Sequence, residues 1–203
     1  MDPERSDRNR PLLLLFCSGA LLLAGCGTVR ETLPARSALE QLVISTAADR
    51  AVARVPDWKL SGDKVFLDTT NLDCYDKPYV VQRIRELLLG SRCTLVDTRQ
   101  EAQIVLQPAS GGLSMNKRDY LLGIPSIPIP VPFADGVLET PEVPIFKAVH
   151  YLGRAKLLFS ALDAETNSQA VEIPVCYGKS RDSYYWVLIF GPIPDGDLPK
   201  GTR

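Results

Sequence analysis

The stretch from residue 64 to 107 decides the fold, with KVFLD at 64–68, a helical pattern over 76–90, CTLVD at 93–97 and QIVLQ at 103–107. The three short runs are rich in β-branched and aliphatic residues, which favour strands. The segment over 76–90 ends at a glycine and has an apolar face at helical spacing: Val80, Val81, Ile84, Leu87 and Leu88. Strand, helix and strand within about 35 residues predict a βαβ unit with a right-handed crossover.

A second helix is predicted over residues 36–54, ahead of this unit. Apolar residues recur there at helical spacing: Leu39, Leu42, Val43, Ala47, Ala51 and Val55. Ser37 followed by Glu40 resembles a capping box. A helix packed on its own domain is the simpler interpretation, and a helix presented to a partner is the alternative.

The C-terminal third has the pattern of antiparallel strands. Residues 153–163 and 169–178 predict a hairpin around the polar turn 164–168. A further aromatic-rich strand over 184–190 is stopped by the Gly-Pro pair at 191–192. We therefore expect the α+β class, with an N-terminal helix, a βαβ unit and antiparallel C-terminal strands that form a small mixed sheet.

The N-terminal segment has the features of a bacterial lipoprotein signal. Residues 11–25 read PLLLLFCSGALLLAG, which is shorter than the roughly 20 apolar residues of a membrane-spanning helix but fits a signal peptide. The run leads into LAGC, which resembles the lipobox, where the signal is cut between Gly25 and Cys26 and the cysteine is acylated. An uncleaved anchor helix and an ordinary signal peptide are the alternatives. Acidic residues depart from the positive charge usual at the start of a signal: Asp2, Glu4 and Asp7.

Lipid on Cys26 would hold the mature chain on a membrane. Each buried CH₂ contributes roughly 0.8 kcal/mol, and two acyl chains such as palmitate give stable anchoring. Gly27 follows the cysteine in place of the aspartate that retains many lipoproteins in the inner membrane. We therefore expect an exported protein, lipid-anchored at the periplasmic face of the outer membrane. The predicted organisation has four parts: a signal peptide at 1–25, a tether at 26–35, a single domain at 36–192 and a flexible tail at 193–203.

A proline-rich apolar stretch follows the βαβ unit, which Gly111 and Gly112 are expected to close. Residues 121–133 read LLGIPSIPIPVPF. The prolines exclude a helix and a central strand, so we expect an extended, polyproline-like loop. The loop either packs on its own domain or contacts a partner or a membrane, since exposed apolar surface marks an interface. Candidate contact residues are Ile124, Ile127, Ile129, Val131 and Phe133.

The cysteines and the single histidine predict neither a metal centre nor a cofactor. Cys74, Cys93 and Cys176 remain once Cys17 leaves with the signal and Cys26 carries lipid. Buried, reduced thiols are the leading interpretation. A disulfide between the second and third of these cysteines stays open. His150 has no metal-ligand companion nearby in the sequence.

No catalytic motif is recognisable, and nucleic acid is not an expected partner. The aspartates near predicted strand ends are better explained as caps or turn formers: Asp68, Asp73 and Asp97. GxSxG, HExxH and a phosphate loop are absent from the sequence. The net charge of -1 gives no electrostatic case for a nucleic-acid surface.

Six segments of the mature chain carry a family resemblance: ALEQLVIS at 38–45, DRA at 49–51, KVFLD at 64–68, GIP at 123–125, PE at 141–142 and GP at 191–192. Together they resemble an uncharacterised family of bacterial lipoproteins of planctomycete type, known by a domain-of-unknown-function label. The resemblance covers most of the mature chain and implies no activity. The chain also resembles, more weakly and in architecture alone, outer-membrane assembly lipoproteins such as the lipopolysaccharide-transport plug and the curli secretion lipoprotein. In those proteins a lipidated cysteine is likewise followed by small α/β units.

The expected function is a non-catalytic binding or assembly role in the cell envelope, on a membrane through lipid on Cys26 and with an envelope protein as the possible partner. The predicted lipid anchor, the proline-rich apolar stretch and the lack of a catalytic motif favour this role. An envelope enzyme of unrecognised type and a purely structural component are the alternatives.

Overall fold

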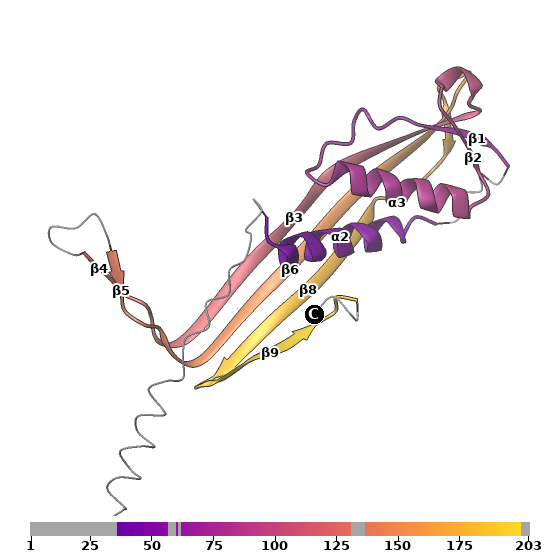
Figure 1. The fold of residues 1–203 in the computed structure, drawn as a ribbon. Helices are drawn as coiled ribbons and strands as arrows, with labels where there is room; N and C mark the ends of the chain where they lie inside the picture. Colours follow the sequence, from indigo (N-terminus) through magenta and orange to yellow (C-terminus); the bar gives the residue numbers. More distant parts are fainter. Residues whose placement is uncertain (1–35, 57–59, 61, 131–136, 200–203) are drawn as a thin grey trace, which may run out of the picture. The chain divides into compact units, whose positions relative to one another are not determined.

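The computed structural model describes residues 36–56, 60, 62–130 and 137–199 (Figure 1). The predicted signal peptide, Cys26 and the tether lie outside the described residues, as do Val131 and Phe133. In the described part, helices α2 and α3 accompany a mixed sheet of mostly antiparallel strands, so the predicted α+β class is confirmed.

The predicted βαβ unit is present. Strand β1 (Lys64–Leu67) runs parallel to β2 (Thr94–Val96), and α3 (Lys77–Gly90) connects them. A short 3₁₀ helix (Arg99–Glu101) then leads into β3 (Ile104–Ile124). The first residues of β3 pair in parallel with the other edge of β1. The apolar face predicted for α3 is buried at Val80, Ile84 and Leu88.

Strand β3 (Ile104–Ile124) is far longer than the five-residue run that the sequence suggested. The expectation that Gly111 and Gly112 close the unit is wrong. The pairing of β3 shifts register between Ser110 and Gly112, so the glycines form a bulge that the strand passes through. Gly112 has a φ of 153°, which a residue with a side chain rarely adopts.

The proline-rich stretch is not the polyproline-like loop that we expected. Residues 121–124 belong to β3, and β4 (Pro128–Pro130) pairs with β5 (Val137–Glu139) in a separate two-stranded ladder. Prolines are compatible with these strands because both strands of a two-stranded ladder are edges, where an N–H can be missing without loss.

The antiparallel part of the sheet is built on β6 (Val143–Asp163), which pairs with β3 along almost its whole length. The predicted hairpin turn at 164–168 is present, but the strand after it, β7 (Gln169–Val171), is short. Strand β8 (Cys176–Val187) is one continuous strand, whereas the sequence predicted separate strands over 169–178 and 184–190. The strand order is β2-β1-β3-β6-β8-β9, where β9 is Phe190–Gly196, and β7 pairs with β6 beside this path.

The predicted tail at 193–203 is wrong in its first residues. Strand β9 (Phe190–Gly196) continues through Pro192 and Pro194 and pairs with β8, and Leu198 beyond it is buried. The prolines at 192 and 194 did not stop the strand because β9 is the edge of the sheet.

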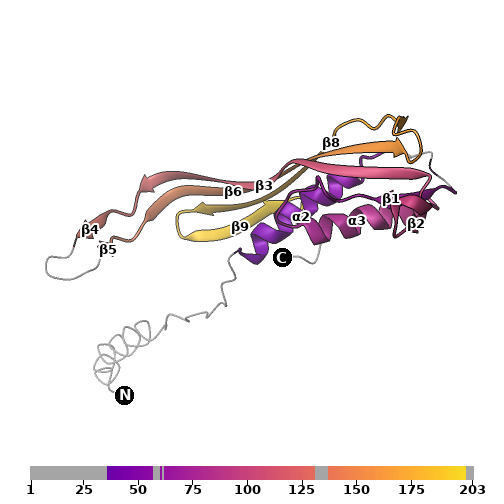
Figure 2. The same ribbon diagram turned by 90° about the horizontal axis from the view of Figure 1, so that it is seen from above.

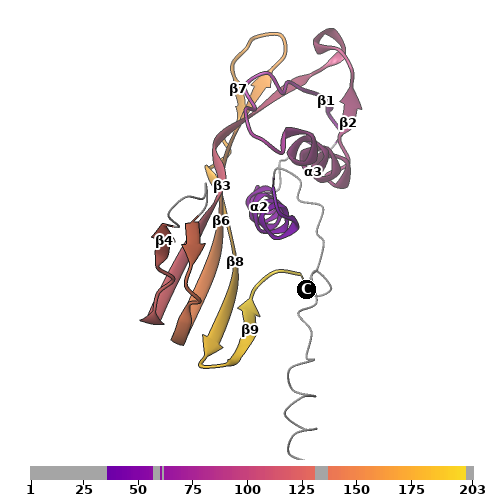
Figure 3. The same ribbon diagram turned by 60° about the vertical axis from the view of Figure 1, so that its left-hand side comes forward.

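Both helices lie against one face of the sheet (Figure 3). Helix α2 (Ala38–Val52) packs on β6 and β8 through small residues, of which Ala47, Ala48 and Ala51 are fully buried. Glycines in the sheet allow this close approach: Gly153 faces Val43, and Gly178 faces Ala47. Figure 2 shows β3, β6, β8 and β9 extending beyond α2 and α3, so neither of these two helices covers that part of the sheet.

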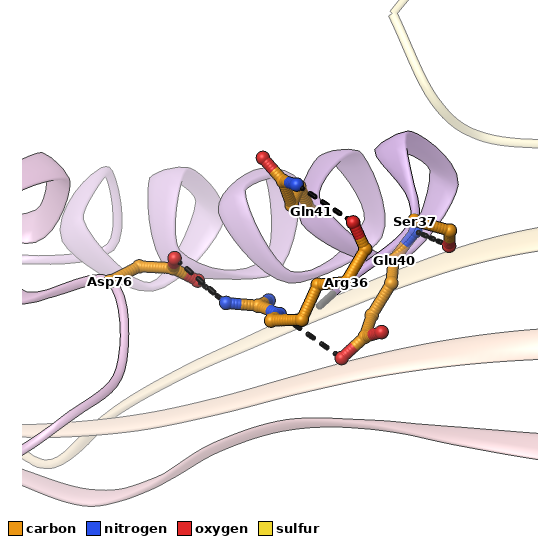
Figure 4. A network of polar contacts seen from close by, with 5 residues as sticks. All are labelled: Arg36, Ser37, Glu40, Gln41 and Asp76. Carbon is orange, nitrogen blue, oxygen red and sulfur yellow. Dashed lines mark hydrogen bonds and ion pairs between the residues drawn. The ribbon is translucent and has the colours of Figure 1, made fainter. Parts of the chain in front are cut away.

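A polar network fixes the start of α2 to the start of α3 (Figure 4). The Arg36 Nη1 group donates to both carboxylate oxygens of Asp76 at 2.9 and 3.0 Å, and its Nε donates to Glu40 at 3.1 Å. Ser37 accepts from the Glu40 amide, as predicted for half of a capping box. The Glu40 carboxylate contacts Arg36 as an ion pair. The network therefore sets the point where the chain enters the folded unit.

Candidate functional site

The face of the sheet opposite α2 and α3, which we call the open face, is defined by the alternation of β6. Odd-numbered residues from 153 to 161 are buried under the helices, and even-numbered residues from 154 to 160 are exposed. Since side chains alternate across a strand and paired residues share a face, the register of β3, β6 and β8 gives the residues of each open-face row.

A row is a set of residues of β3, β6 and β8 that pair across the sheet on one face. On the open face, the rows farthest from β1 and β2 consist mainly of apolar and aromatic residues. The register places Tyr120 and Tyr185 on either side of Ala148, and Leu122 and Val187 on either side of Phe146. Strand β9 extends these rows with Ile193 beside Tyr185 and Phe190 beside Val187. Tyr120, Leu122 and Phe190 are 52%, 63% and 66% exposed. Large apolar side chains at this end of the sheet therefore face solvent.

A ladder of aromatic rings crosses these rows. The ring centroids of Tyr120 and His150 lie 5.6 Å apart, and His150 lies 5.6 Å from Tyr185. Phe146 lies 6.4 Å from Tyr185 in the next row. The Nδ1 atom of His150 is 2.9 Å from Ser183 Oγ. The two contacts of His150 are edge-to-face and the Phe146–Tyr185 contact is tilted, so these rings pack against one another across the paired strands.

The opposite face of the same strands is also aromatic. Tyr184 lies 6.2 Å from Tyr151 and 6.3 Å from Trp186. The ammonium group of Lys147 is 5.8 Å from the centre of the Trp186 ring and 2.7 Å from a Glu142 carboxylate oxygen. We use "distal sheet" for residues 117–124 of β3, 143–151 of β6 and 182–187 of β8, together with β9.

Three of the predicted contact residues lie at or beyond the end of the distal sheet. Ile124 ends β3, Ile127 precedes β4 and Ile129 lies within it, and these side chains are 60%, 53% and 45% exposed. Val143 and Ile145 of β6 are exposed beside them. The described part of the stretch does not pack into the core, so the packed-loop interpretation is wrong for these three isoleucines.

Sequence reasoning missed most of the surface. The apolar residues that it did not assign are Tyr120, Leu122, Phe146, Tyr185, Val187 and Phe190. The available signal was the run YYWVLIF at 184–190, where apolar residues follow one another without alternation. Such a run marks a strand with two apolar faces, but the pattern alone does not tell whether those faces are buried.

The titratable residues form no recognisable catalytic or metal site in the described part of the chain. No group of three or more His, Cys, Asp or Glu residues there could hold a metal ion. The described cysteines Cys74, Cys93 and Cys176 are free thiols, and burial raises the pKa of each. A raised pKa keeps these thiols protonated and poorly nucleophilic at neutral pH.

None of the helices among the described residues combines the length and apolar character needed to cross a membrane.

The residues that the structure describes form a two-layer α+β protein, in which α2 and α3 cover one sheet face and the other, partly aromatic face carries no described helix. The chain belongs to the DUF6655 family, a family of unknown function whose sequence model matches residues 20–203. The prediction that the chain belongs to an uncharacterised family is therefore confirmed. No curated protein matches the chain.

Proposed function

We propose that this protein is a non-catalytic, lipid-anchored binding protein of the cell envelope that contacts its partner through the distal sheet. The observation that carries the proposal is the apolar surface on both faces of strands that extend beyond the helices. Monomeric soluble proteins rarely expose contiguous apolar surface of this extent unless it is an interface.

The side chains of the distal sheet project from paired strands and contact one another, which favours binding. Aromatic contacts restrict Tyr120, His150 and Tyr185. Restricted side chains lose little freedom on association, so more of the gain from burying apolar area appears as affinity. That gain is roughly 25 cal/mol per Å² of apolar surface removed from water.

The anchor is the second part of the proposal. The LAGC run supports acylation of Cys26, and Gly27 favours the periplasmic face of the outer membrane over retention in the inner membrane. A fully extended chain from Cys26 to Arg36 reaches at most about 35 Å. A lipid on Cys26 would therefore keep the folded unit, which begins at Arg36, near the membrane surface.

The binding surface can be tested by photocrosslinking in cells, with a photoreactive residue in place of Leu122 or Ile145. We expect both positions to give the same discrete crosslinked product, and Phe146→Ser to abolish it without changing the melting temperature. A photoreactive residue at Leu158, which is exposed on the open face outside the distal sheet, should give none.

Two outcomes count against the proposal. If photoreactive residues at Leu122 and Ile145 give no crosslinked product in intact cells, the distal sheet is not a binding surface. Equal products from Leu158 would show that the reaction reports exposure alone.

A further inference from the structure

The type of exposed side chain on the distal sheet changes along its strands. At the end that holds the β8–β9 turn, the exposed side chains are mainly aliphatic. Exposed side chains there come from the β3–β4 connection, the β8–β9 turn and the strands beside them: Leu122, Ile124, Ile127, Ile129, Val143, Ile145, Val187, Leu188, Ile189 and Phe190. Leu188 and Ile189 form the β8–β9 turn, where Ile189 is 90% exposed. The end of the sheet is thus apolar on the open face and at the β8–β9 turn, while its other face also carries the ion pair of Lys147 with Glu142.

Aromatic residues with polar atoms come next. Tyr120 and Tyr185 lie on the open face, one row behind Leu122 and Val187. Tyr184 and Trp186 lie on the other face. Tyrosine and tryptophan are enriched where proteins meet the interfacial layer of a membrane, because each has an apolar ring and a polar group.

Cations follow on the open face. Arg118 lies in the row of His150, Arg181 in the row of Leu152, and Arg154 lies beside Lys179. Counting along β6, Arg154 is eight residues from Phe146, which corresponds to roughly 27 Å. The order along the open face is therefore aliphatic, aromatic and then basic.

A basic hollow of about 270 Å³ lies at the rows of Arg154 and Lys156, lined by Gly111, Gly112, Arg154, Lys156, Tyr177 and Lys179. The glycine bulge makes room for it, because a side chain at Gly111 would lie 2.9 Å from Lys156 Cδ. The Lys156 ammonium group is 6.0 Å from the centre of the Tyr177 ring. The hollow therefore offers several cationic donors to one small anion, such as a phosphate group.

The distribution of ion pairs distinguishes the two faces. On the helix side, Lys117 pairs with Asp119 at 3.0 Å and Lys147 with Glu142 at 2.7 Å. On the open face, only Arg181 has a carboxylate partner among the described residues: Arg118, Arg154, Lys156 and Lys179 form no ion pair with them. The excess positive charge is thus on the open face.

We propose that the distal sheet inserts its apolar end into the interfacial layer of an anionic phospholipid bilayer, with the open face turned toward the lipid phosphates. This inference rests on the proposed function and names the partner of the same surface. Aliphatic side chains enter the layer, the tyrosines and Trp186 lie at its boundary, and the unpaired cations meet the headgroups. Each basic residue near an anionic leaflet adds to the attraction.

A bilayer explains this pattern better than a second protein surface does. A protein interface has an apolar centre surrounded by a polar rim, whereas the distal sheet has its apolar part at one end and changes in only one direction. The reach of at most about 35 Å from an acylated Cys26 would also hold this end close to the membrane that carries the anchor.

Insertion can be measured on the full-length lipidated protein in vesicles of phosphatidylethanolamine and phosphatidylglycerol. Phe190→Trp, in a Trp58→Phe and Trp186→Tyr background, places a single tryptophan at the apolar end. We expect lipids brominated near the carbonyl end of their acyl chains to quench it strongly. Leu158→Trp in the same background should remain unquenched. Equal quenching at both positions, or none at Phe190→Trp, overturns the inference.

The charge requirement gives a second test. Arg154→Gln with Lys179→Gln should lower the ratio of inserted to free sheet by about tenfold or more, and vesicles of phosphatidylcholine alone should lower it similarly. The matched control, Arg54→Gln with Arg85→Gln, removes two exposed cations that lie just after α2 and on α3, outside the open face, and should leave quenching unchanged. Equal loss in the control pair overturns the role of the open face.

The two proposals fail in different ways. Crosslinks from Leu122 to a protein, together with unquenched tryptophan at 190, would overturn bilayer insertion while the distal sheet stands as a binding surface. A lack of any crosslink from Leu122 or Ile145, to protein or to phospholipid, would overturn both.

Discussion

The α-carbon of Gly178 in β8 lies against the carbonyl oxygen of Ala47 in α2 so closely that no side chain fits between them. A methyl group at position 178 would overlap that oxygen and lie 2.7 Å from the amide nitrogen of Ala51. The neighbouring contact, from Ser180 Oγ to the carbonyl oxygen of Val43, is a hydrogen bond of 2.5 Å. Close backbone approach therefore attaches α2 to the sheet, together with the buried side chains of Val43 and Val52.

Gly178→Ala is expected to destabilise the protein by at least the ~1–3 kcal/mol typical of overpacking, because α2 must move to accommodate the methyl group. The measurement is the midpoint of thermal or chemical unfolding. Gly90→Ala is the matched control, since a Cβ there meets no atom within 4 Å and alanine favours a helix by up to about 1 kcal/mol. A Gly178→Ala protein as stable as the parent would contradict this packing.

Ile84→Asp should cause a large loss of stability, because Ile84 is fully buried in the core under α3 and an unpaired buried charge is among the costliest single changes. Gln82→Asp on the exposed side of the same helix is the control. A melting temperature for Ile84→Asp within a degree or two of the parent would be inconsistent with the described core, since even ~1 kcal/mol shifts it by several degrees.

Stability should decline in acid partly through Asp68. Hydrogen bonds from Thr70 and from Gln107, at 2.6 Å from Thr70 Oγ1 and 2.9 Å from Gln107 Nε2, hold the pKa of Asp68 below its usual value. A lowered pKa in the folded state contributes stability above the unfolded pKa of about 3.9, and this contribution is lost as pH falls through the folded-state pKa.

The test is the free energy of unfolding as a function of pH for Asp68→Asn. We expect its slope below about pH 4 to be shallower than that of the parent, while Asp97→Asn, an exposed aspartate without a hydrogen bond among the described residues, should follow the parent. Parallel curves for Asp68→Asn and the parent would refute the role of these hydrogen bonds.

The described thiols should differ in accessibility. Cys74 is partly exposed, whereas Cys93 and Cys176 are 6% and 2% exposed. Burial raises the pKa of all three, and the carboxylates of Asp76 and Asp73 raise that of Cys74 further. We expect a thiol reagent to label Cys74 slowly in the folded protein and all three after unfolding, as mapped by mass spectrometry. A peptide pair joined through Cys93 and Cys176 would show a disulfide instead.

Cys26→Ser tests the anchor. The variant should accumulate as an unprocessed precursor that incorporates no labelled fatty acid, because the hydroxyl does not replace the thiol that is acylated. The comparison is Cys17→Ser, which alters a cysteine inside the signal and should leave labelling intact. Continued labelling and cleavage of Cys26→Ser would show that the lipobox assignment is wrong.

The sequence by itself determined the elements whose signals are local. The apolar face of α3, the stripe of α2 and the polar turn at 164–168 were each predictable, because helical spacing and turn chemistry lie within about a dozen neighbouring residues. The parallel pairing of β1 with β2 followed as well, since a strand, helix and strand can return to one sheet in few ways. The contact role predicted for Ile124, Ile127 and Ile129 from the proline-rich stretch stays a prediction, and the structure shows these side chains exposed.

Only the tertiary structure decided how far β3 and β6 extend and which of their side chains share a face. The pairing of residues such as Tyr120 with Ala148, or Arg154 with Lys179, joins segments that are 25 to 28 positions apart. A shift of one residue in that register would move each side chain to the opposite face. Local sequence patterns do not fix such a register. The open face, its basic hollow and its apolar end therefore arise from long-range strand pairing and from the packing of α2 and α3 on one face of the sheet.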